Sequence, residues 1–447
     1  MRAADLGDAR VAIWGLGREG RAAIGFLRAR HPRLSLIVLD DAEGAAQSGD
    51  FDNLEYAFGP RAIAQALGRA DVLVKSPGVS LYRPEIAQAR ERGIVITSLL
   101  NLWFAEGPTL ETICVTGTKG KSTTASLLAH ILARLGRRTA LAGNIGVPVA
   151  AIDQTAADIA VIEVSSYQAA DFDGLCDIAV LTSLFPEHLD WHGSLDAYYR
   201  DKLNLLRHSR YAIANRAATP AHGLAQAFFG DVAGLHWCGN AIFDGAARIG
   251  AVGNRYLARP HNLSNLSAAL AVVKRLGLDI DLAAALAAAE DFRALPHRQQ
   301  EIGEIDGVLY VDDSISTAPQ STLAALDVYA GREVTLIVGG YDRGIDYRPL
   351  VERLAGGAAH AIICLGDSGR RIHDQLRARN PELAGLAASL SMTEAVAAAK
   401  RMTASGGVVL LSPAAPSYGQ YRDFAERGRD FVAKAGLAGA AAGGEAA

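Results

Sequence analysis

A glycine-punctuated stretch at residues 112–123 carries the strongest chemical signal in the chain. The apolar, β-branched run 112–115 leads into GTKGKST at 117–123, and a helical pattern follows. This order predicts a strand, a phosphate-binding loop and a helix, because glycines let the backbone close around a phosphate at the positive end of a helix. Lys121 is expected to neutralise the β- and γ-phosphates, and the Ser122 hydroxyl to hold Mg²⁺. The stretch therefore predicts an ATP site, although its two glycines lie closer together than in the common phosphate loop.

A second glycine motif lies near the N-terminus. GLGREG at 15–20 follows the apolar run 10–14 and precedes a helical pattern, and Asp40 closes the next apolar run about twenty residues further on. This is the fingerprint of dinucleotide sites and by itself favours a nicotinamide enzyme. Its physical requirement is only a diphosphate at a helix N-terminus with an acid near a hydroxyl, which a UDP-sugar meets equally well.

Acids and histidines follow two further strand-like runs. The run 159–162 ends directly at Glu163, and another ends at PEHLDWHG, residues 186–193. A carboxylate that closes a buried strand is costly unless it is paired or binds a metal. These groups indicate an Mg²⁺ and substrate edge, and a polar surface loop is the alternative. Lys202 lies in a following helical pattern capped by Ser194; a lone helical lysine is expected to be solvated.

The composition is that of an ordinary globular protein. The 447 residues carry a formal net charge of −4, which argues against nucleic acid or an anionic membrane as the main partner. The four cysteines are scattered without a C-x-x-C pair, so neither a disulfide framework nor a zinc site is indicated. With no signal-peptide pattern and no long uncharged apolar run, we expect a cytoplasmic protein.

Alternating strand and helix patterns predict an α/β protein of three domains. The first, residues 1–98, is Rossmann-like, with strands at 10–14 and 34–40 and a third in the run ADVLVK that ends at the Pro77-Gly78 turn. The second, residues 99–295, carries the phosphate loop. It also carries Asn262 and Asn265, which share one helix face and could read a purine edge, unless Asn262 is a helix cap. The third, residues 296–447, is a second Rossmann-like domain.

The chain resembles the Mur ligase family, which forms amide bonds in peptidoglycan precursors at the expense of ATP. The matching motifs run through almost the whole length: GTKGKSTT (117–124), GNIG (143–146), EVSSYQ (163–168), PEHLDWHG (186–193), HNLSN (261–265), LPHR (295–298), DDS (312–314), GGYDRG (339–344) and LLSPAAPSYGQYRDFAERG (410–428). The short first domain and the SPAAPS…DFAERG ending resemble the branch that adds glutamate to UDP-N-acetylmuramoyl-L-alanine through an acyl phosphate.

The resemblance implies a role for each matching residue. Lys121, His188 and Lys202 would be catalytic, Lys202 as a carbamylated lysine that binds metal together with Ser122, Glu163 and His188. ATP would contact Gly117, Thr118, Lys119, Gly120, Lys121, Ser122, Thr123, Asn262, Asn265, Arg298 and Asp313. The UDP-substrate would contact Gly15, Leu16, Gly17, Arg18, Asp40, Ser76, Pro77, Gly78, Asn144 and Ser165. Glutamate would contact Thr317, Arg343, Ser417 and Phe424. ATP and Mg²⁺ are the implied cofactors, and a monomer is expected.

Three positions depart from the common glutamate ligase. Lys119 occupies the position of an asparagine in the phosphate loop. Ile315 replaces the lysine of the third-domain motif, and Arg343 replaces a lysine in the glycine-rich turn. An uncharged Ile315 cannot hold a carboxylate, and arginine presents a planar fork where lysine presents a point charge. With WGLGREGRAA and FPEHLDWHG, these changes resemble the variant branch that adds L-glutamate.

Other functions remain open from the sequence alone. The ordinary D-glutamate ligase is the nearest alternative. A nicotinamide oxidoreductase built on residues 15–20 is a distant third, because it leaves the phosphate loop and Glu163 without a role. A non-catalytic sensor of ATP or UDP-sugar is disfavoured by the complete set of Lys121, Glu163, His188 and Lys202.

Overall fold

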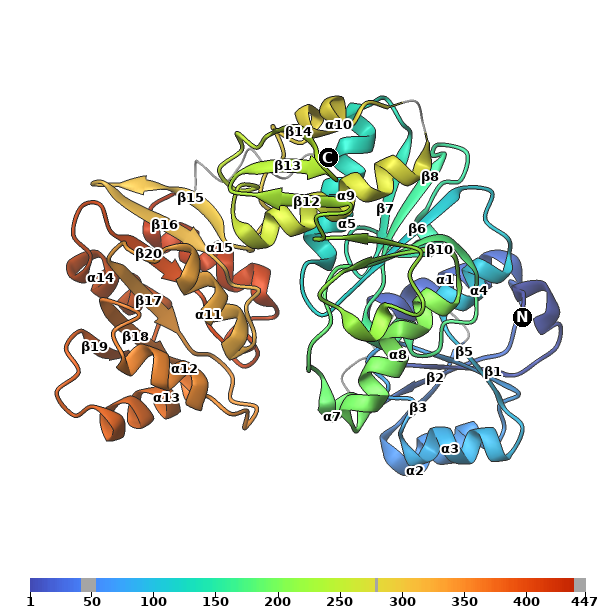
Figure 1. Cartoon of the computed structure of the whole chain (residues 1–447). Coiled ribbons are helices and arrows are strands. Elements are labelled where there is room, and N and C mark those ends of the chain that lie inside the picture. Colours follow the sequence, from blue (N-terminus) through green and yellow to red (C-terminus); the bar gives the residue numbers. More distant parts are fainter. Residues whose placement is uncertain (42–53, 278–279, 438–447) are drawn as a thin grey trace. The chain divides into compact units, whose positions relative to one another are not determined.

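The computed structural model describes residues 1–41, 54–277 and 280–437, and these residues form two compact units, Met1–Phe292 and Arg293–Ala447. The units contain three β-sheets, two in the first unit and one in the second (Figure 1). The three-domain α/β architecture predicted from the sequence is therefore present. The predicted border at residue 98 falls inside the first unit and stays a prediction.

The N-terminal sheet has five parallel strands in the order β3-β2-β1-β4-β5. Its strands are β1 (Val11–Trp14), β2 (Leu36–Asp40), β3 (Glu55–Phe58), β4 (Val72–Lys75) and β5 (Val95–Thr97). Helix α1 (Arg18–Arg30) packs on one face, and α2 (Gly59–Leu67) and α3 (Pro84–Glu91) pack on the other (Figure 1). The predicted strand in ADVLVK is confirmed as β4, but the sequence analysis missed β3, which precedes it. The short, partly exposed edge strand β3 has no continuous apolar run that could have revealed it.

The central sheet has nine strands in the order β14-β13-β12-β11-β10-β9-β6-β8-β7, parallel from β7 to β12 and antiparallel beyond. Its strands are β6 (Glu111–Thr116), β7 (Thr139–Gly143), β8 (Ile159–Glu163), β9 (Cys176–Leu181), β10 (Ser209–Asn215), β11 (Ala227–Phe229), β12 (Leu235–Cys238), β13 (Ala241–Asp244) and β14 (Ala247–Ala251). Its helices are α4 (Leu99–Ala105), α5 (Lys121–Arg134), α6 (Ser166–Ala169), α7 (Leu189–His192), α8 (Leu195–Arg207), α9 (Pro260–Leu276) and α10 (Leu282–Ala288). Helices α5 and α9 pack together over one face, where their apolar side chains close the core.

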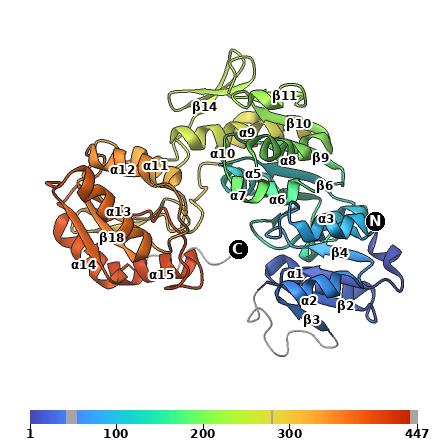
Figure 2. The same ribbon diagram turned by 90° about the horizontal axis from the view of Figure 1, so that it is seen from below.

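The second unit contains a six-stranded sheet in the order β15-β16-β20-β17-β18-β19, in which only β15 is antiparallel. Its strands are β15 (Gln300–Ile305), β16 (Val308–Asp312), β17 (Val334–Val338), β18 (Ala361–Leu365), β19 (Leu386–Ser389) and β20 (Val408–Leu411). Helices α11 (Pro319–Val328), α12 (Arg348–Ala355) and α13 (Gly366–Arg379) cover one face, and α14 (Met392–Met402) and α15 (Phe424–Ala435) cover the other (Figure 2).

Parallel strands end at a common edge, and this edge brings the predicted site residues together within each sheet. In the central sheet the phosphate loop follows β6, Glu163 ends β8, and the segment with His188 follows β9. In the second unit Asp313 follows β16 and the GGYDRG turn follows β17. Of the described residues, no helix is both long and apolar enough to span a bilayer.

The close approach of α1 to β1 depends on a glycine. A Cβ atom at Gly20 would overlap the main-chain carbonyl oxygen of Gly15. We therefore expect Gly20→Ala to lower the free energy of unfolding of the first unit by about 1–3 kcal/mol, since backbone cannot move aside as a side chain can. Gly25→Ala, on the same helix with open space around it, should instead raise it by about 0.5–1 kcal/mol. Urea unfolding of both variants measures the contrast, and equal effects would contradict this account of the packing.

Candidate active site

Two lysines converge on the phosphate loop. Lys121, the first residue of α5, donates from Nζ to the carbonyl oxygens of Gly117 at 3.0 Å and Thr118 at 3.1 Å. Lys202 of α8 donates to the same Gly117 carbonyl at 2.8 Å. Gly117 and Gly120 have φ angles of 149° and 90°, which non-glycine residues rarely adopt, and a Cβ at either would overlap a neighbouring side chain. The glycines are therefore required for this loop conformation.

The Lys202 side chain is buried, with 1% of the residue exposed, so the expectation that it is solvated was wrong. Burial, reinforced by the positive charge of Lys121, lowers the pKa of Lys202 well below its ordinary value. A helical pattern cannot show this burial, because it depends on elements packed against α8 from elsewhere in the chain, among them α6, α7 and β6. Burial therefore favours the neutral amine of Lys202 more than it would at an exposed lysine.

Lys119 makes an ion pair that the sequence did not predict. Its Nζ lies 2.5 Å from Oε1 of Glu187, and its backbone N–H donates to Ser183 Oγ at 2.9 Å. Burial alone would raise the pKa of Glu187, but Lys119, His188 and Lys121 together hold it below its ordinary value. Glu187 is therefore a carboxylate at the rim of the loop.

Glu163 and Asn144 meet at the ends of β8 and β7. Glu163 is 1% exposed; its Oε1 accepts a hydrogen bond from Asn144 Nδ2 at 3.0 Å, and its Oε2 is buried without a hydrogen-bond partner in the described structure. A buried carboxylate oxygen with an open coordination position fits a cation. His188 lies on the segment between β9 and α7, and its backbone is left-handed, with φ of 55°. Burial lowers the pKa of its imidazole.

These groups fit the donor set of Mg²⁺. No group of three or more His, Cys, Asp or Glu side chains suited to a metal occurs among the described residues. Mg²⁺ does not need one, because it retains waters and takes one or two carboxylates together with substrate phosphates. Glu163, His188 and the hydroxyl of Ser122 are therefore a sufficient protein contribution.

The predicted UDP-binding residues form a connected group at the carboxyl edge of the N-terminal sheet. The backbone N–H of Leu16 donates to Asp40 Oδ2 at 2.8 Å, and Ser76 Oγ donates to the carbonyl of Gly15 at 2.7 Å. Arg18 donates to the carbonyls of Gly143 at 2.7 Å and Gly146 at 3.2 Å. Arg18 thus connects the N-terminal sheet to the loop that carries Asn144. Gly17 caps α1 with its backbone, Ser165 caps α6 and accepts from the backbone N–H of Gln168, and Pro77 and Gly78 form the turn after β4.

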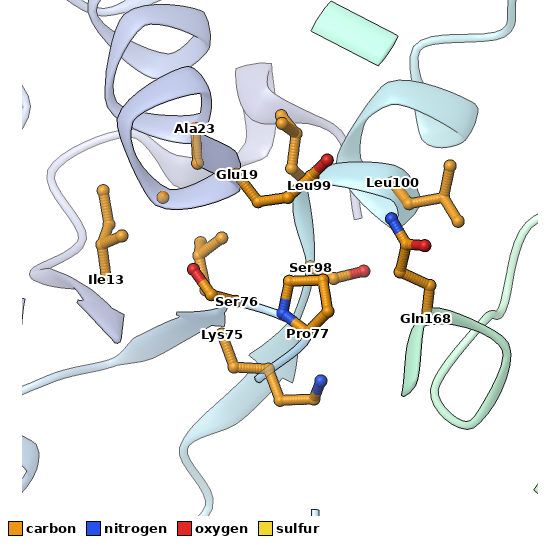
Figure 3. Close-up of a pocket in the computed structure, with 12 residues that line it drawn as sticks. Ile13, Glu19, Ala23, Lys75, Ser76, Pro77, Ser98, Leu99, Leu100 and Gln168 are labelled. Carbon is orange, nitrogen blue, oxygen red and sulfur yellow. The ribbon is translucent and has the colours of Figure 1, made fainter. Parts of the chain in front are cut away.

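A cavity of about 10 Å³ lies beneath this turn (Figure 3). Lys75, Ser76, Pro77 and Gln168 line it, and it has room for about one water molecule. Lys75 is buried there and pairs with Asp171, 3.3 Å away. The cavity is too small for a nucleotide-sugar, and the turn residues Ser76 and Pro77 form part of its lining.

Asn262 and Asn265 lie together in the first turns of α9, as predicted. Asn265 Nδ2 donates to Asn262 Oδ1 at 3.1 Å, and Asn262 Nδ2 donates to the carbonyl of Tyr256 at 2.9 Å. The alternative that Asn262 caps the helix was wrong, since Arg259 is the capping residue. Asn265 Oδ1 accepts from Thr124 Oγ1 at 3.2 Å, which places this pair beside α5 of the phosphate loop.

In the second unit, Asp313 lies in a buried network at the end of β16. Ser316 Oγ and Ser412 Oγ donate to its Oδ2 at 2.5 and 2.8 Å, and the Gln299 N–H donates to its Oδ1 at 3.1 Å. Burial raises its pKa to about 6 against these hydrogen bonds and the charge of Arg298. Arg298 lies on the segment before β15.

The predicted glutamate-binding residues lie at the same carboxyl edge of the sheet in the second unit. Exposed Arg343 donates from Nη2 to the carbonyl of Thr317 at 3.1 Å. The carbonyl of Phe424, at the start of α15, accepts from Ser314 Oγ at 2.8 Å, and Ser417 is buried after β20. Ile315, which stands where the common ligase has lysine, is only half-buried. Loops that follow three strands therefore meet here.

Three residues that sequence reasoning missed form a network beside the site. Tyr82, His192 and Asp201 are linked by hydrogen bonds between the N-terminal domain and helices α7 and α8. His192 belonged to the quoted motif PEHLDWHG, and Asp201 directly precedes Lys202, but no spacing in the sequence links either residue to Tyr82.

Comparison with known proteins identifies the chain's relatives. Residues 9–98 match the N-terminal domain described as Mur ligase MurD-like, residues 115–230 the Mur ligase middle domain, and residues 297–415 the Mur ligase glutamate ligase domain. A UDP-N-acetylmuramoyl-L-alanine–L-glutamate ligase of Xanthomonas axonopodis pv. citri (strain 306) is 44% identical over 458 residues, covering 98% of this chain and 97% of that protein. The ligase of the same name from Salinispora tropica is 41% identical, covering 97% and 98%. The chain belongs to the Mur ligase family.

Solved structures agree with this membership at the level of the fold. The UDP-N-acetylmuramate–alanine ligase of Thermotoga maritima superimposes with a TM-score of 0.61 at 20% identity, covering 95% of this chain and 99% of that one. A second Mur ligase from Thermotoga maritima, solved with ADP, gives a TM-score of 0.56 at 14% identity. The nicotinamide alternative was wrong, because the segment that suggested it matches a Mur ligase domain.

The raised pKa of Asp313 makes a testable contribution to the stability of this Mur ligase. Between about pH 4 and pH 6 the unfolded chain has lost this proton while the folded chain retains it, so the free energy of unfolding falls as pH rises through this window. We expect the wild-type second unit to lose up to about 3 kcal/mol between pH 4 and 7 relative to Asp313→Asn. Urea unfolding across this range measures the difference, and parallel pH profiles would contradict it.

Proposed function

We propose that this Mur ligase joins L-glutamate to UDP-N-acetylmuramoyl-L-alanine in peptidoglycan precursor synthesis, with ATP as the energy source. The relatives of that name support the proposal because they are 40–44% identical and align with nearly the full length of both chains. Full-length alignment matters because the reaction needs a nucleotide-sugar site, a phosphate loop and an amino-acid site together.

The observation that carries the phosphoryl-transfer half is the convergence of Lys121 and Lys202 on the carbonyl of Gly117. Two lysine side chains at one loop, at a helix N-terminus, support a site for phosphate anions. Gly117, Thr118, Lys119, Gly120, Ser122 and Thr123 complete the loop that we assign to ATP. We assign the adenine to Asn262 and Asn265, and the remaining ATP contacts to Arg298 and Asp313 of the second unit.

The reaction follows from these assignments. The alanyl carboxylate attacks the γ-phosphorus of ATP, ADP leaves, and an acyl phosphate results. Lys121 stabilises the negative charge that gathers on the phosphoryl oxygens during this step. Mg²⁺, held by Ser122, Glu163 and His188, would add charge neutralisation at the same phosphates. The amine of glutamate then attacks the acyl carbon, and phosphate leaves with the bonding electron pair while the amine loses a proton.

Lys202 fits the role of a carbamylated lysine. Only the neutral form of an amine attacks carbon dioxide, and burial shifts the pKa of Lys202 downward, toward that form. Carbamylation converts the amine into an anionic group with two oxygens, beside Lys121 and the open oxygen of Glu163. The product would therefore relieve a repulsion between two lysines and add a ligand for Mg²⁺.

The substrate sugar would lie along the edge from Gly15 to Ser165. Gly15, Leu16, Gly17 and Arg18 would hold the diphosphate at the N-terminus of α1, with Asp40 and the turn Ser76-Pro77-Gly78 beside it. Asn144 and Ser165 would lie on the muramoyl side, since Arg18 ties the loop of Asn144 to this group. The four free cysteines and the nucleotide substrates fit a cytoplasmic enzyme, and we expect a monomer.

The preference for L-glutamate rests on the second unit. Ile315 offers no charge to a carboxylate, whereas Arg343 can bind one through two parallel hydrogen bonds. Arg343 already contacts the carbonyl of Thr317, so it is held at this edge, with Ser417 and the backbone at Phe424 available as neutral partners. Reversing the configuration of glutamate exchanges the directions of its carboxylate and side chain and leaves one carboxylate against an apolar wall. D-glutamate addition is the alternative function.

The deciding experiment is a paired ligation assay with L- and D-glutamate, using UDP-N-acetylmuramoyl-L-alanine and ATP. We expect kcat/KM for L-glutamate to exceed that for D-glutamate by about 100-fold or more, because an unpaired carboxylate costs a few kcal/mol. Arg343→Ala should lose most of the activity with L-glutamate. Arg353→Ala, an exposed arginine on α12, is the control and should retain it. A preference for D-glutamate would contradict the proposal and support the D-glutamate-adding ligase instead.

Carbamylation of Lys202 can be observed without turnover. With ¹³C-bicarbonate, we expect the wild-type protein to show a protein-bound carbamate resonance in ¹³C NMR that is lost in Lys202→Ala. Lys274→Ala, an exposed lysine paired with Asp244, should retain the resonance. A carbamate signal that persists in Lys202→Ala, or its absence from wild type at saturating bicarbonate, would contradict the assignment.

A further inference from the structure

Four side chains form a continuous hydrogen-bonded relay within the first unit. Tyr82 Oη lies 2.8 and 3.0 Å from the two carboxylate oxygens of Asp201. Asp201 Oδ2 lies 2.7 Å from His192 Nδ1, and His192 Nε2 lies 3.1 Å from Ser166 Oγ. The relay thus begins in the N-terminal domain, crosses helices α8 and α7, and ends on α6.

The burial of the relay makes its hydrogen bonds directional and costly to break. The His192 side chain is fully buried, and Asp201 and Ser166 are 5% and 3% exposed, while the ring of Tyr82 reaches the surface. The carboxylate of Asp201 can only accept, so Tyr82 donates to it and Nδ1 of His192 carries a proton. Arg200, whose Nη2 donates to Tyr82 Oη at 2.7 Å and lies 3.5 Å from Asp201, offsets the buried charge.

Each end of the relay is attached to a segment of the proposed site. Tyr82 follows the turn Ser76-Pro77-Gly78 on the UDP side. Asp201 directly precedes Lys202 on α8, and Ser166 directly follows Ser165. The relay therefore spans from the turn on the nucleotide-sugar side to Ser165, assigned to the muramoyl side, and to Lys202 at the phosphate loop.

A second set of contacts runs parallel to the relay. Ser80 Oγ donates to the carbonyl of Trp191 at 2.7 Å, and Trp191 Nε1 donates to the carbonyl of Pro77 at 3.2 Å. The indole also stacks on Tyr167, with ring centroids 4.6 Å apart and an interplanar angle of 21°. The two sets together hold the turn after β4 against α7 in one orientation.

We propose that Tyr82, Asp201, His192 and Ser166 are positioning residues that set the distance between the UDP-binding turn and the phosphoryl-transfer centre. This inference rests on the proposed function. A substrate anchored by its diphosphate at one end presents its alanyl carboxylate correctly only if that distance is fixed. Small displacements of reacting atoms cost rate with little effect on binding. The relay is therefore expected to act on kcat and to leave substrate affinity unchanged.

A Ser–His–Asp sequence of hydrogen bonds is also the arrangement of a hydrolytic triad. The burial of Ser166 and His192 excludes that role here, because an acyl group must reach the serine hydroxyl to be attacked. The same burial suits a positioning role, since water cannot compete for the hydrogen bonds.

The experiment is a double-mutant cycle on the two ends of the relay, which do not hydrogen-bond to each other. Tyr82→Phe removes one hydroxyl and keeps the ring, and Ser166→Ala removes the other end. We expect each to lower kcat about tenfold, with the KM for UDP-N-acetylmuramoyl-L-alanine unchanged. The double variant should also lose about tenfold, because one break already releases the relay. Tyr56→Phe on β3 is the control and should leave kcat unchanged, alone or combined with Ser166→Ala.

The outcomes separate the relay from the proposed function. Ligation by the wild-type enzyme tests the function, and the ratio of variant to wild-type kcat tests the relay. A double variant that loses about 100-fold, the product of independent effects, would overturn the relay, as would losses confined to KM. The thermal shift induced by UDP-N-acetylmuramoyl-L-alanine should match wild type in Tyr82→Phe. If Ser166→Ala does not fold, His192→Asn takes its place, since it breaks the link to Ser166 while keeping an N–H for Asp201.

Discussion

The carbonyl oxygen of Gly117 accepts hydrogen bonds from two lysines, and much of the first unit serves to make this possible. Two ammonium groups at one oxygen repel each other, and Lys202 is fully enclosed. The repulsion is tolerated because Glu163 and Glu187 lie nearby and because burial favours the neutral form of Lys202. An anion at this loop would lie beside both lysines, so the phosphate-binding role that we propose rests on the loop's electrostatics as well as on its glycines.

The elements that the sequence predicted well are those whose signal is local. The phosphate loop, its helix and the acid at the end of β8 each follow from a short run of residues, and the structure has them in place. Strand β3 was missed because it is short and lies at a sheet edge with only Ala57 buried. The burial of Lys202 was missed for a different reason: it depends on tertiary contacts, such as the hydrogen bond to Gly117, which lies 85 residues away in the chain.

Resemblance to a family extended the prediction to residues with no local signal, and the structure adds how these residues are held. Asp40 was expected beside a sugar hydroxyl, and it accepts the backbone N–H of Leu16. Arg18 was expected at the diphosphate, and it donates to the carbonyls of Gly143 and Gly146. These hydrogen bonds hold the loops through the protein's own groups. Loops that are held in this way lose less conformational entropy when they bind a substrate.

Ile315 changes the charge at the carboxyl edge of the sheet in the second unit. A lysine at that position would bring a charge beside Asp313, whose carboxyl already has a pKa raised to about 6 by burial. With Ile315, the serines Ser316 and Ser412 satisfy Asp313 through neutral hydrogen bonds, and the positive charge that remains is that of Arg343 on a different loop. Losing the charge at residue 315 and keeping the one at Arg343 changes the direction from which an anionic amino acid is attracted. A change of direction is what distinguishes two enantiomers that carry the same groups, so stereochemical preference follows from where the remaining charge lies.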